Sequence, residues 1–312
     1  MKIFRCGRFL ALAAFLVLAL VAVPVEAGVW RLDGSMMTET PRNFRLVSEP
    51  WPREFTGEAP DRTGLDTLFA SASGQPSRSG IAFLYRRLSQ AAPAGSILYL
   101  LDLRQESHGF ADNLPVSWYE DRNRANDGRS VPEIEQDETQ RLAALSGTRA
   151  IFQPLGREDE AAYLPRAFSP RTTATERATA EAAGFRYVRL AAADMVWPAA
   201  PVVDEFLALV AALPENAWLH FHCQAGRGRT TTFLAMYDIL RNPGVPLEDI
   251  ARRQALLGGS DLLAEAAGDS WYACQHRHRA AMLRLFYRYA TEQRGAAAPL
   301  AWSEWLSARG EG

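Results

Sequence analysis

The sequence predicts an α/β fold in which a mainly parallel central sheet is flanked by helices. Segments with strand character alternate with helical segments through roughly the first two thirds of the chain. The remaining part is mostly helical, as expected for helices that cover a sheet. With 312 residues, the chain has room for one large domain, or for one domain with a smaller insertion.

Short apolar segments are expected to form the strands of this sheet. Residues 96–103 form a continuous apolar run, which is typical of a strand buried on both faces. Further strands are expected at residues 150–154, 185–190 and 217–221. Residues 28–72 are rich in Pro, Arg and Asp, and residues 104–127 are polar and aromatic without periodicity, so we expect both to be irregular.

Apolar residues at helical spacing predict the helices. Within residues 77–91, for example, Ile81, Leu84 and Leu88 share one helical face. The other expected helices are 132–145, 172–183, 200–213, 230–240, 247–257, 271–290 and a short one near Trp302.

The first residues have the pattern of an export signal. A basic start precedes the apolar run Phe9–Val23, and Ala27 completes a small-residue cleavage site. We therefore expect residues 1–27 to be a signal peptide, residues 28–312 to form the domain, and the protein to be exported to the periplasm or secreted. An uncleaved N-terminal anchor is the alternative interpretation.

Charge and cysteine content limit the possible partners. The formal net charge is −2, so there is no overall attraction to nucleic acid or to an anionic membrane surface, and any anion site must be local. We expect no nucleic-acid partner, and no stable membrane association after signal cleavage. Two cysteines lie outside the predicted signal peptide, Cys223 and Cys274, and we expect Cys223 to be free.

The segment from His222 to Thr230 has the pattern of a phosphate-binding loop. It lies between a predicted strand and a predicted helix. Backbone N–H groups in such a loop converge on an anion, and the helix N-terminus adds positive potential. The residues expected to surround a bound phosphate are Gln224, Ala225, Gly226, Arg227 and Gly228.

The residue types in this loop point to a two-step phosphatase. The positive field favours a nucleophilic thiolate at Cys223, which would attack phosphorus and form a cysteinyl-phosphate. Arg229 would clamp two phosphate oxygens bidentately. Thr230 is expected to hydrogen-bond the sulfur, and His222 to orient the loop through backbone hydrogen bonds. A buried cysteine ahead of a helix with incidental arginines is the alternative.

The acid required by a leaving alkoxide is predicted at Asp194. This residue follows a strand and precedes a helix, and Trp197-Pro198 would stiffen its loop. Because loops after neighbouring parallel strands meet at one edge of the sheet, the Asp194 carboxyl can reach the phosphate loop.

Several other polar residues allow two interpretations each. Arg227 suits a substrate with several phosphates, or is a solvated side chain. Residues 102–109 either line the pocket through Arg104 or His108, or form a polar network that fixes the loops. Residues 276–279 are either a basic rim or a solvated helix face.

No metal site is expected from the histidines of the predicted strand. His220 and His222 share one face of that strand, but no third ligand lies nearby in the sequence.

The Cys-x5-Arg-Thr loop with an upstream Trp-Pro aspartate resembles the cysteine-dependent protein tyrosine phosphatase superfamily. More motifs resemble those of the bacterial tyrosine-phosphatase-like phytases, which are exported inositol polyphosphate phosphatases. These motifs are residues 32–33, 41–45, 102–109, 116–119, 180–184, 194–198 and 220–231.

The resemblance implies a phosphatase core with a small β-barrel-like insertion drawn from about residues 105–170. It also implies stepwise, metal-independent and cofactor-free removal of phosphates from myo-inositol hexakisphosphate and lower inositol polyphosphates. Cys223 would be the nucleophile, Arg229 the clamp and Asp194 the acid. Substrate contacts are expected from Arg45, Arg157 and His276. A protein-tyrosine or phosphoinositide phosphatase, or a polyanion-binding pseudophosphatase, are the alternatives.

The chain departs from the family pattern around the pocket. Gln224 replaces a glutamate, Arg227 an apolar residue and Asn123 an aspartate. Basic positions at the rim carry Glu158, Asp159 and Tyr272. The rim has therefore lost cations while the loop has gained one, and we expect substrate choice to differ accordingly.

Overall fold

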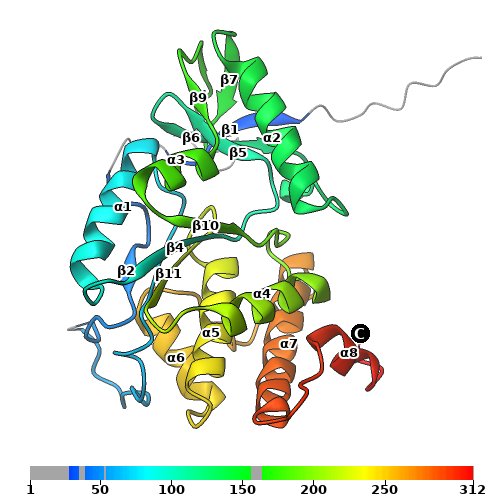
Figure 1. Cartoon of the computed structure of the whole chain (residues 1–312). Helices are drawn as coiled ribbons and strands as arrows, with labels where there is room; N and C mark the ends of the chain where they lie inside the picture. The colour runs from blue at the N-terminus through cyan, green and yellow to red at the C-terminus, as the bar shows by residue number, and fades with distance from the viewer. Residues whose placement is uncertain (1–27, 35–38, 53, 156–163, 312) are drawn as a thin grey trace, which may run out of the picture.

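The fold consists of two sheets joined by helices and loops (Figure 1). The computed structural model describes residues 28–34, 39–52, 54–155 and 164–311. The predicted signal peptide therefore lies outside the described residues. We call the five-stranded sheet the central sheet and the six-stranded sheet the second sheet. In Figure 1 the second sheet lies at the top of the view and the central sheet across the middle, with helices below it.

The central sheet is mainly parallel, as the sequence predicted. Its strand order is β10 (Arg186–Arg189), β4 (Ile97–Asp102), β11 (Ala217–His222), β3 (Ala70–Ser73) and β2 (Arg45–Leu46). The first four strands run parallel, and β2 is an antiparallel edge. Asp102, His222 and Ser73 are in register at the carboxyl ends of β4, β11 and β3, so the loops after these strands begin at one edge of the sheet.

Helices cover both faces of this sheet. The apolar side chains of α1 (Arg78–Ala91) and α3 (Glu176–Ala183) pack on one face. The other face is covered by α4 (Ala200–Ala212), α5 (Gly228–Arg241), α6 (Leu247–Leu256) and α7 (Trp271–Gln293). No helix in the described ranges combines the length and apolar character needed to cross a membrane.

The helix boundaries agree with the predicted ones except at α3. The prediction began this helix at residue 172, but Thr173–Ala174 forms the short strand β9. Thr175 then caps the helix by accepting a hydrogen bond from the Ala178 N–H, and Gly184 ends it with φ of 107°. The side-chain cap, rather than the apolar periodicity, therefore sets the start of the helix.

The second sheet contains β8 (Arg166–Phe168), β7 (Ala150–Gln153), β1 (Val29–Leu32), β6 (Leu114–Tyr119), β5 (His108–Ala111) and β9, in that order. Helix α2 (Val131–Leu145) packs its buried leucines against this sheet. Four of the strands come from the expected insertion, residues 105–170, while β1 and β9 lie outside it.

The prediction of irregular structure was wrong in two segments. Residues 28–72 contribute β1, β2 and the start of β3, and residues 104–127 contribute β5 and β6. Charged and polar residues in or next to these strands obscured the usual alternation. They are buried nonetheless, because Asp33, His108 and Ser117 find polar partners inside the protein.

Aromatic packing attaches the C-terminal helix α8 (Trp302–Ser307) to the core. Trp302 is fully buried, and its ring stacks on that of Trp305, with 5.6 Å between centroids. It also contacts Phe286 of α7 and, at 6.4 Å, Trp197 in the loop that carries Asp194. The Trp-Pro segment of that loop is thus held by side chains more than a hundred residues away in sequence.

We expect Trp302→Ala to lower the free energy of unfolding by about 3–5 kcal/mol, because it removes a fully buried indole and leaves a cavity. Urea unfolding measures the change. Leu300→Ala, at an exposed position two residues earlier, is the control and should change stability by less than about 0.5 kcal/mol. Equal effects of the two substitutions would contradict this account of the core.

Candidate active site

The loop after β11 is shaped by a glycine that no other residue could replace. Gly226 has φ of 72°, and a Cβ there would lie 2.3 Å from the Gly74 nitrogen and 2.4 Å from the Ser73 carbonyl carbon. The loop therefore packs directly on the end of β3. Cys223, at its start, is buried and free of any disulfide, as expected.

Residues 42–45 bind the carbonyl groups of this loop from behind. Arg42 donates to the Gln224 oxygen at 3.0 Å, Asn43 to the Ala225 oxygen at 2.7 Å. Arg45 donates to the Gly226 oxygen at 2.8 Å. In a trans peptide the N–H points opposite to the C=O. The N–H groups of residues 225–227 therefore point away from residues 42–45, as a concave anion site requires.

The prediction that Arg45 contacts substrate does not fit this placement. Its side chain is 2% exposed and lies behind the loop, bonded to the loop backbone. Burial lowers the pKa of its guanidinium to about 10, against the opposing effect of Cys223. Arg45 supports the loop because it supplies the donors that the loop carbonyls need.

Arg229 is held in place by a carboxylate that the sequence analysis did not single out. Its two terminal nitrogens donate to Glu106, Nη1 to Oε2 at 2.7 Å and Nη2 to Oε1 at 3.0 Å. Nη2 also lies 3.2 Å from Oδ1 of Asp194. The Nε–H has no partner among the described residues, so it remains available to an anion in the loop.

Glu106 joins two buried arginines. Arg104 donates its Nε–H to Oε1 of Glu106 at 2.8 Å, and both side chains are fully buried. Burial alone would raise the pKa of Glu106, but Arg229 and Arg104 outweigh it and hold that pKa well below its usual value. Glu106 is therefore ionised over the whole working pH range, and Arg229 keeps a fixed anionic support.

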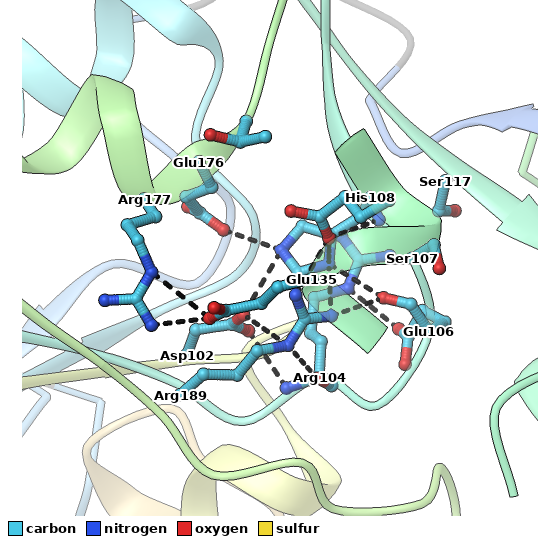
Figure 2. Close-up of polar contacts among 12 residues, drawn as sticks. Asp102, Arg104, Glu106, Ser107, His108, Ser117, Glu135, Glu176, Arg177 and Arg189 are labelled. Carbon is cyan, nitrogen blue, oxygen red and sulfur yellow. Dashed lines mark hydrogen bonds and ion pairs between the residues drawn. The ribbon is translucent and has the colours of Figure 1, made fainter. Parts of the chain in front are cut away.

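A wider buried network surrounds Glu106 (Figure 2). Arg104 reaches Asp33 at 2.7 Å, and Asp33 in turn accepts from the amide of Gln224 at 2.7 Å. His108 bonds Glu176 at 2.8 Å. Of the two interpretations of residues 102–109, the structure supports the polar network rather than the pocket lining. Within this network the Gln224 side chain points toward Asp33.

His222 and Thr230, which were also predicted to act in the loop, are both fully buried. His222 is fully buried, with Nε2 3.5 Å from Oε1 of Glu176. Burial, together with Arg104 and Arg229, lowers the pKa of His222 to about 3, so the ring is neutral at ordinary pH. The predicted hydrogen bond from Thr230 to the Cys223 sulfur is absent, because the Thr230 hydroxyl has no hydrogen-bond partner among the described residues.

Asp194 lies beside Arg229, where the topology argument expected it. Its side chain is 17% exposed, and Oδ2 accepts from Nδ2 of Asn123 at 2.8 Å. The loop backbone is held by Arg279 of α7, whose Nη2 donates to the Met195 oxygen at 2.5 Å. The thiol of Cys223 and the carboxyl group of Asp194 therefore come from two loops at one sheet edge, and the Arg229 guanidinium comes from the first turn of α5.

The residues predicted around the rim of the pocket lie nearer the protein surface. Arg227 is exposed at the start of α5, and Gly228 follows it as the first residue of that helix. His276 is half-buried on α7, and Tyr272 is exposed one turn earlier. The predicted contact Arg157, together with Glu158 and Asp159, lies outside the described residues.

One group within the described ranges could hold a metal ion by distance alone. Ligand atoms of Asp102, His108 and Glu176 lie within 4.8 Å of one another. The Nε of Arg189 lies 3.3 Å from Asp102, and His108 is already bonded to Glu176. The neighbouring guanidinium satisfies the carboxylate and would repel a divalent cation, so the group does not fit a metal site.

A Cys-x5-Arg loop between the central strand and a helix, with an aspartate loop beside it, defines the class of cysteine-dependent phosphatase folds. A family model of tyrosine-phosphatase-like phytases, described by the words inositol hexakisphosphate, matches residues 157–241. A tyrosine-phosphatase-like phytase from Bdellovibrio bacteriovorus is 30% identical, with a TM-score of 0.68, over 90% of this chain and 95% of that one. The chain belongs to the tyrosine-phosphatase-like phytase family.

Two other relatives are longer than this chain. The tandemly repeated phytase of Mitsuokella multacida is 38% identical, with a TM-score of 0.84, over 91% of this chain and 50% of that one. A structure of a tyrosine-phosphatase-like myo-inositol phosphatase from the same organism contains bound myo-inositol-(1,3,4,5)-tetrakisphosphate. This chain covers 49% of the length of that protein chain. The effector protein hopD2 of Pseudomonas syringae is 32% identical over 162 residues, which are 49% of this chain and 34% of hopD2.

We expect Glu106→Gln to lower the free energy of unfolding by about 3 kcal/mol or more, because two buried guanidinium groups lose a shared anionic partner. Urea unfolding measures this. The matched control is Glu135→Gln, whose partner Arg177 is 39% exposed; breaking that pair should cost less than about 1 kcal/mol. A loss at Glu106 no larger than at Glu135 would contradict the role given to this pair.

Acid should destabilise the protein partly through His220, which bonds Ser71 and Ser73 inside the sheet. Burial, with His222 and Arg45, keeps the pKa of His220 well below its usual value. Below about pH 6.5 the unfolded chain therefore binds a proton that the folded chain does not, and stability present above that pH is lost as pH falls.

His220→Asn should flatten the pH dependence of unfolding between pH 6 and pH 4 by about 1.4 kcal/mol per pH unit, the equivalent of one proton. Chemical unfolding at a series of pH values measures the slope. His278→Asn, at an exposed position on α7, should leave the slope unchanged. If His220→Asn has the same slope as the unsubstituted protein, the His220 imidazole does take up a proton in the folded state.

Proposed function

We propose that this protein hydrolyses phosphate monoesters of inositol polyphosphates through a cysteinyl-phosphate intermediate. The observation that carries the proposal is the anion site formed by the loop N–H groups and the Arg229 guanidinium, with Cys223 at its base. Membership in the phytase family and the inositol tetrakisphosphate bound by a relative support the substrate class.

In the first step the Cys223 thiolate attacks phosphorus, and the bond from phosphorus to the inositol oxygen breaks. Arg229 and the loop N–H groups stabilise the negative charge on the phosphoryl oxygens. Asp194 gives its proton to the leaving oxygen, because an alkoxide is a poor leaving group. Glu106 keeps the guanidinium oriented through both of its terminal nitrogens.

In the second step a water molecule attacks the cysteinyl-phosphate. The Asp194 carboxylate left by the first step takes a proton from that water, and the phosphorus–sulfur bond breaks. Inorganic phosphate leaves, the thiolate is restored, and Asp194 again holds a proton. The two loops thus complete a cycle in which each group returns to its starting state.

The surroundings of the loop support a substrate with several phosphates. Arg227 is exposed beside the loop, so its guanidinium is free to meet a neighbouring phosphate. Such a site would remove phosphate groups one at a time from myo-inositol hexakisphosphate and from less phosphorylated inositols. Residues 1–27 support export to the periplasm or beyond, and the near-neutral net charge supports a small-molecule substrate rather than nucleic acid.

Purified protein should release inorganic phosphate from myo-inositol hexakisphosphate, and Cys223→Ser should lower the rate by at least about 10³-fold, because the hydroxyl is not activated as a nucleophile in this field. A phosphate-release assay measures both, and binding of inositol tetrakisphosphate by Cys223→Ser shows that the loop is intact.

The same assay includes a phosphotyrosyl peptide and a phosphoinositide. Release from these substrates alone would replace the inositol polyphosphate assignment. Full activity in Cys223→Ser would refute the mechanism, and binding without turnover in the unsubstituted protein would indicate a pseudophosphatase.

A further inference from the structure

The turn that follows β6 brings an amide group from the second sheet to the acid loop. This turn, η1 (Asp121–Asn123), ends with Asn123, whose side chain is buried, with 3% of the residue exposed. Its Nδ2–H donates to Oδ2 of Asp194 at 2.8 Å, across 71 residues of sequence. We propose that Asn123 is a positioning residue, which fixes the Asp194 oxygen that carries the transferred proton; this rests on the proposed function.

The two oxygens of Asp194 have different neighbours, and the difference selects the oxygen that holds the proton. Oδ1 lies 3.2 Å from the Arg229 guanidinium and accepts the Met195 N–H at 3.0 Å. A cation and a donor at Oδ1 both disfavour a proton there. Within the described ranges, Oδ2 has the neutral amide of Asn123 as its one hydrogen-bond partner, which occupies one lone pair and leaves the other for the proton.

The backbone of the turn shows that this contact is specifically built. Arg122 and Asn123 have φ of 58° and 65°, two successive residues in the left-handed region, which side chains other than glycine rarely adopt. Asparagine tolerates this region better than most residues. The Arg122 guanidinium lies over the Trp271 ring at the start of α7, 4.6 Å from its centroid, so the turn is also fixed on its other side.

The acid loop is held from the opposite direction by its backbone. Met195 has φ of 65°, and its carbonyl accepts from Arg279 at 2.5 Å. This contact fixes the main chain but does not orient the Asp194 side chain. Among the described residues, only Arg229 and Asn123 contact that carboxyl group through their side chains. Without Asn123, only the contacts of Oδ1 would limit rotation of the Asp194 carboxyl group.

The test compares leaving groups, because only a poor leaving group needs the proton. Asn123→Gly removes the amide without left-handed strain, since glycine accepts positive φ. We expect kcat on myo-inositol hexakisphosphate to fall by about 10- to 100-fold, part of the usual contribution of a general acid. Turnover of p-nitrophenyl phosphate should change by less than about threefold, because that leaving group needs no acid.

Two further variants separate positioning from a structural effect. Asn123→Asp keeps the shape but places a carboxylate beside Asp194, which makes ionisation of Asp194 harder. The alkaline limb of the pH–rate profile should therefore move to higher pH for the inositol substrate alone. Asn113→Gly, which removes an amide that caps α1 from the β5–β6 turn, is the matched control and should leave the ratio of the two rates unchanged.

Asp194→Asn is the reference variant. It should show the same dependence on leaving group. Adding Asn123→Gly to it should lower kcat on myo-inositol hexakisphosphate little further, because the two residues act as one unit. Equal losses on both substrates in Asn123→Gly, or fully additive losses with Asp194→Asn, would overturn the assignment to Asn123. If Asp194→Asn itself shows no dependence on leaving group, the acid role fails, and the assignment fails with it.

Discussion

The ion pair between Glu106 and Arg229 is the interaction on which the rest of the site depends. In the proposed function Arg229 presents its guanidinium to a phosphate, yet this side chain is buried, and a buried cation without a fixed partner is costly. Glu106 supplies two contacts and leaves the Nε–H without a partner among the described residues. Because Arg104 also binds Glu106 and reaches Asp33, the orientation of the Arg229 guanidinium is tied to the second sheet.

This arrangement explains why so many charges lie inside the protein. Removing paired charges from water brings little net stability, so a network of this size is better explained by the geometry it fixes. Asp33 follows β1, Glu106 precedes β5, and Glu138 lies on α2, so the second sheet and its helix supply most of the anions. Arg189 lies on β10 of the central sheet, and Arg229 lies in the first turn of α5, which follows the loop after β11. The two sheets are therefore joined by charge pairs as well as by apolar packing.

The second sheet also contacts the proposed catalytic residues directly. Through Asn123 it contacts Asp194, and through Gln224 and Asp33 it contacts the loop itself. The loop N–H groups, by contrast, are oriented by residues 42–45, which lie behind the loop. An anion bound in the loop would thus lie between supports from three separate parts of the chain, which limits how far any one group can move.

The sequence by itself determined the parallel sheet, most helix boundaries and the position of the Cys223 loop between a strand and a helix, because these depend on local periodicity and on neighbouring residues. Topology also brought Asp194 to the correct edge. Tertiary structure decided the rest: Arg45 lies behind the loop, residues 102–109 form a buried polar network in which Glu106 contacts Arg229, and β1 joins a sheet built mainly from residues 105–170. These contacts join residues far apart in sequence, and a buried charge has the same sequence pattern as a solvated one until its partner is known.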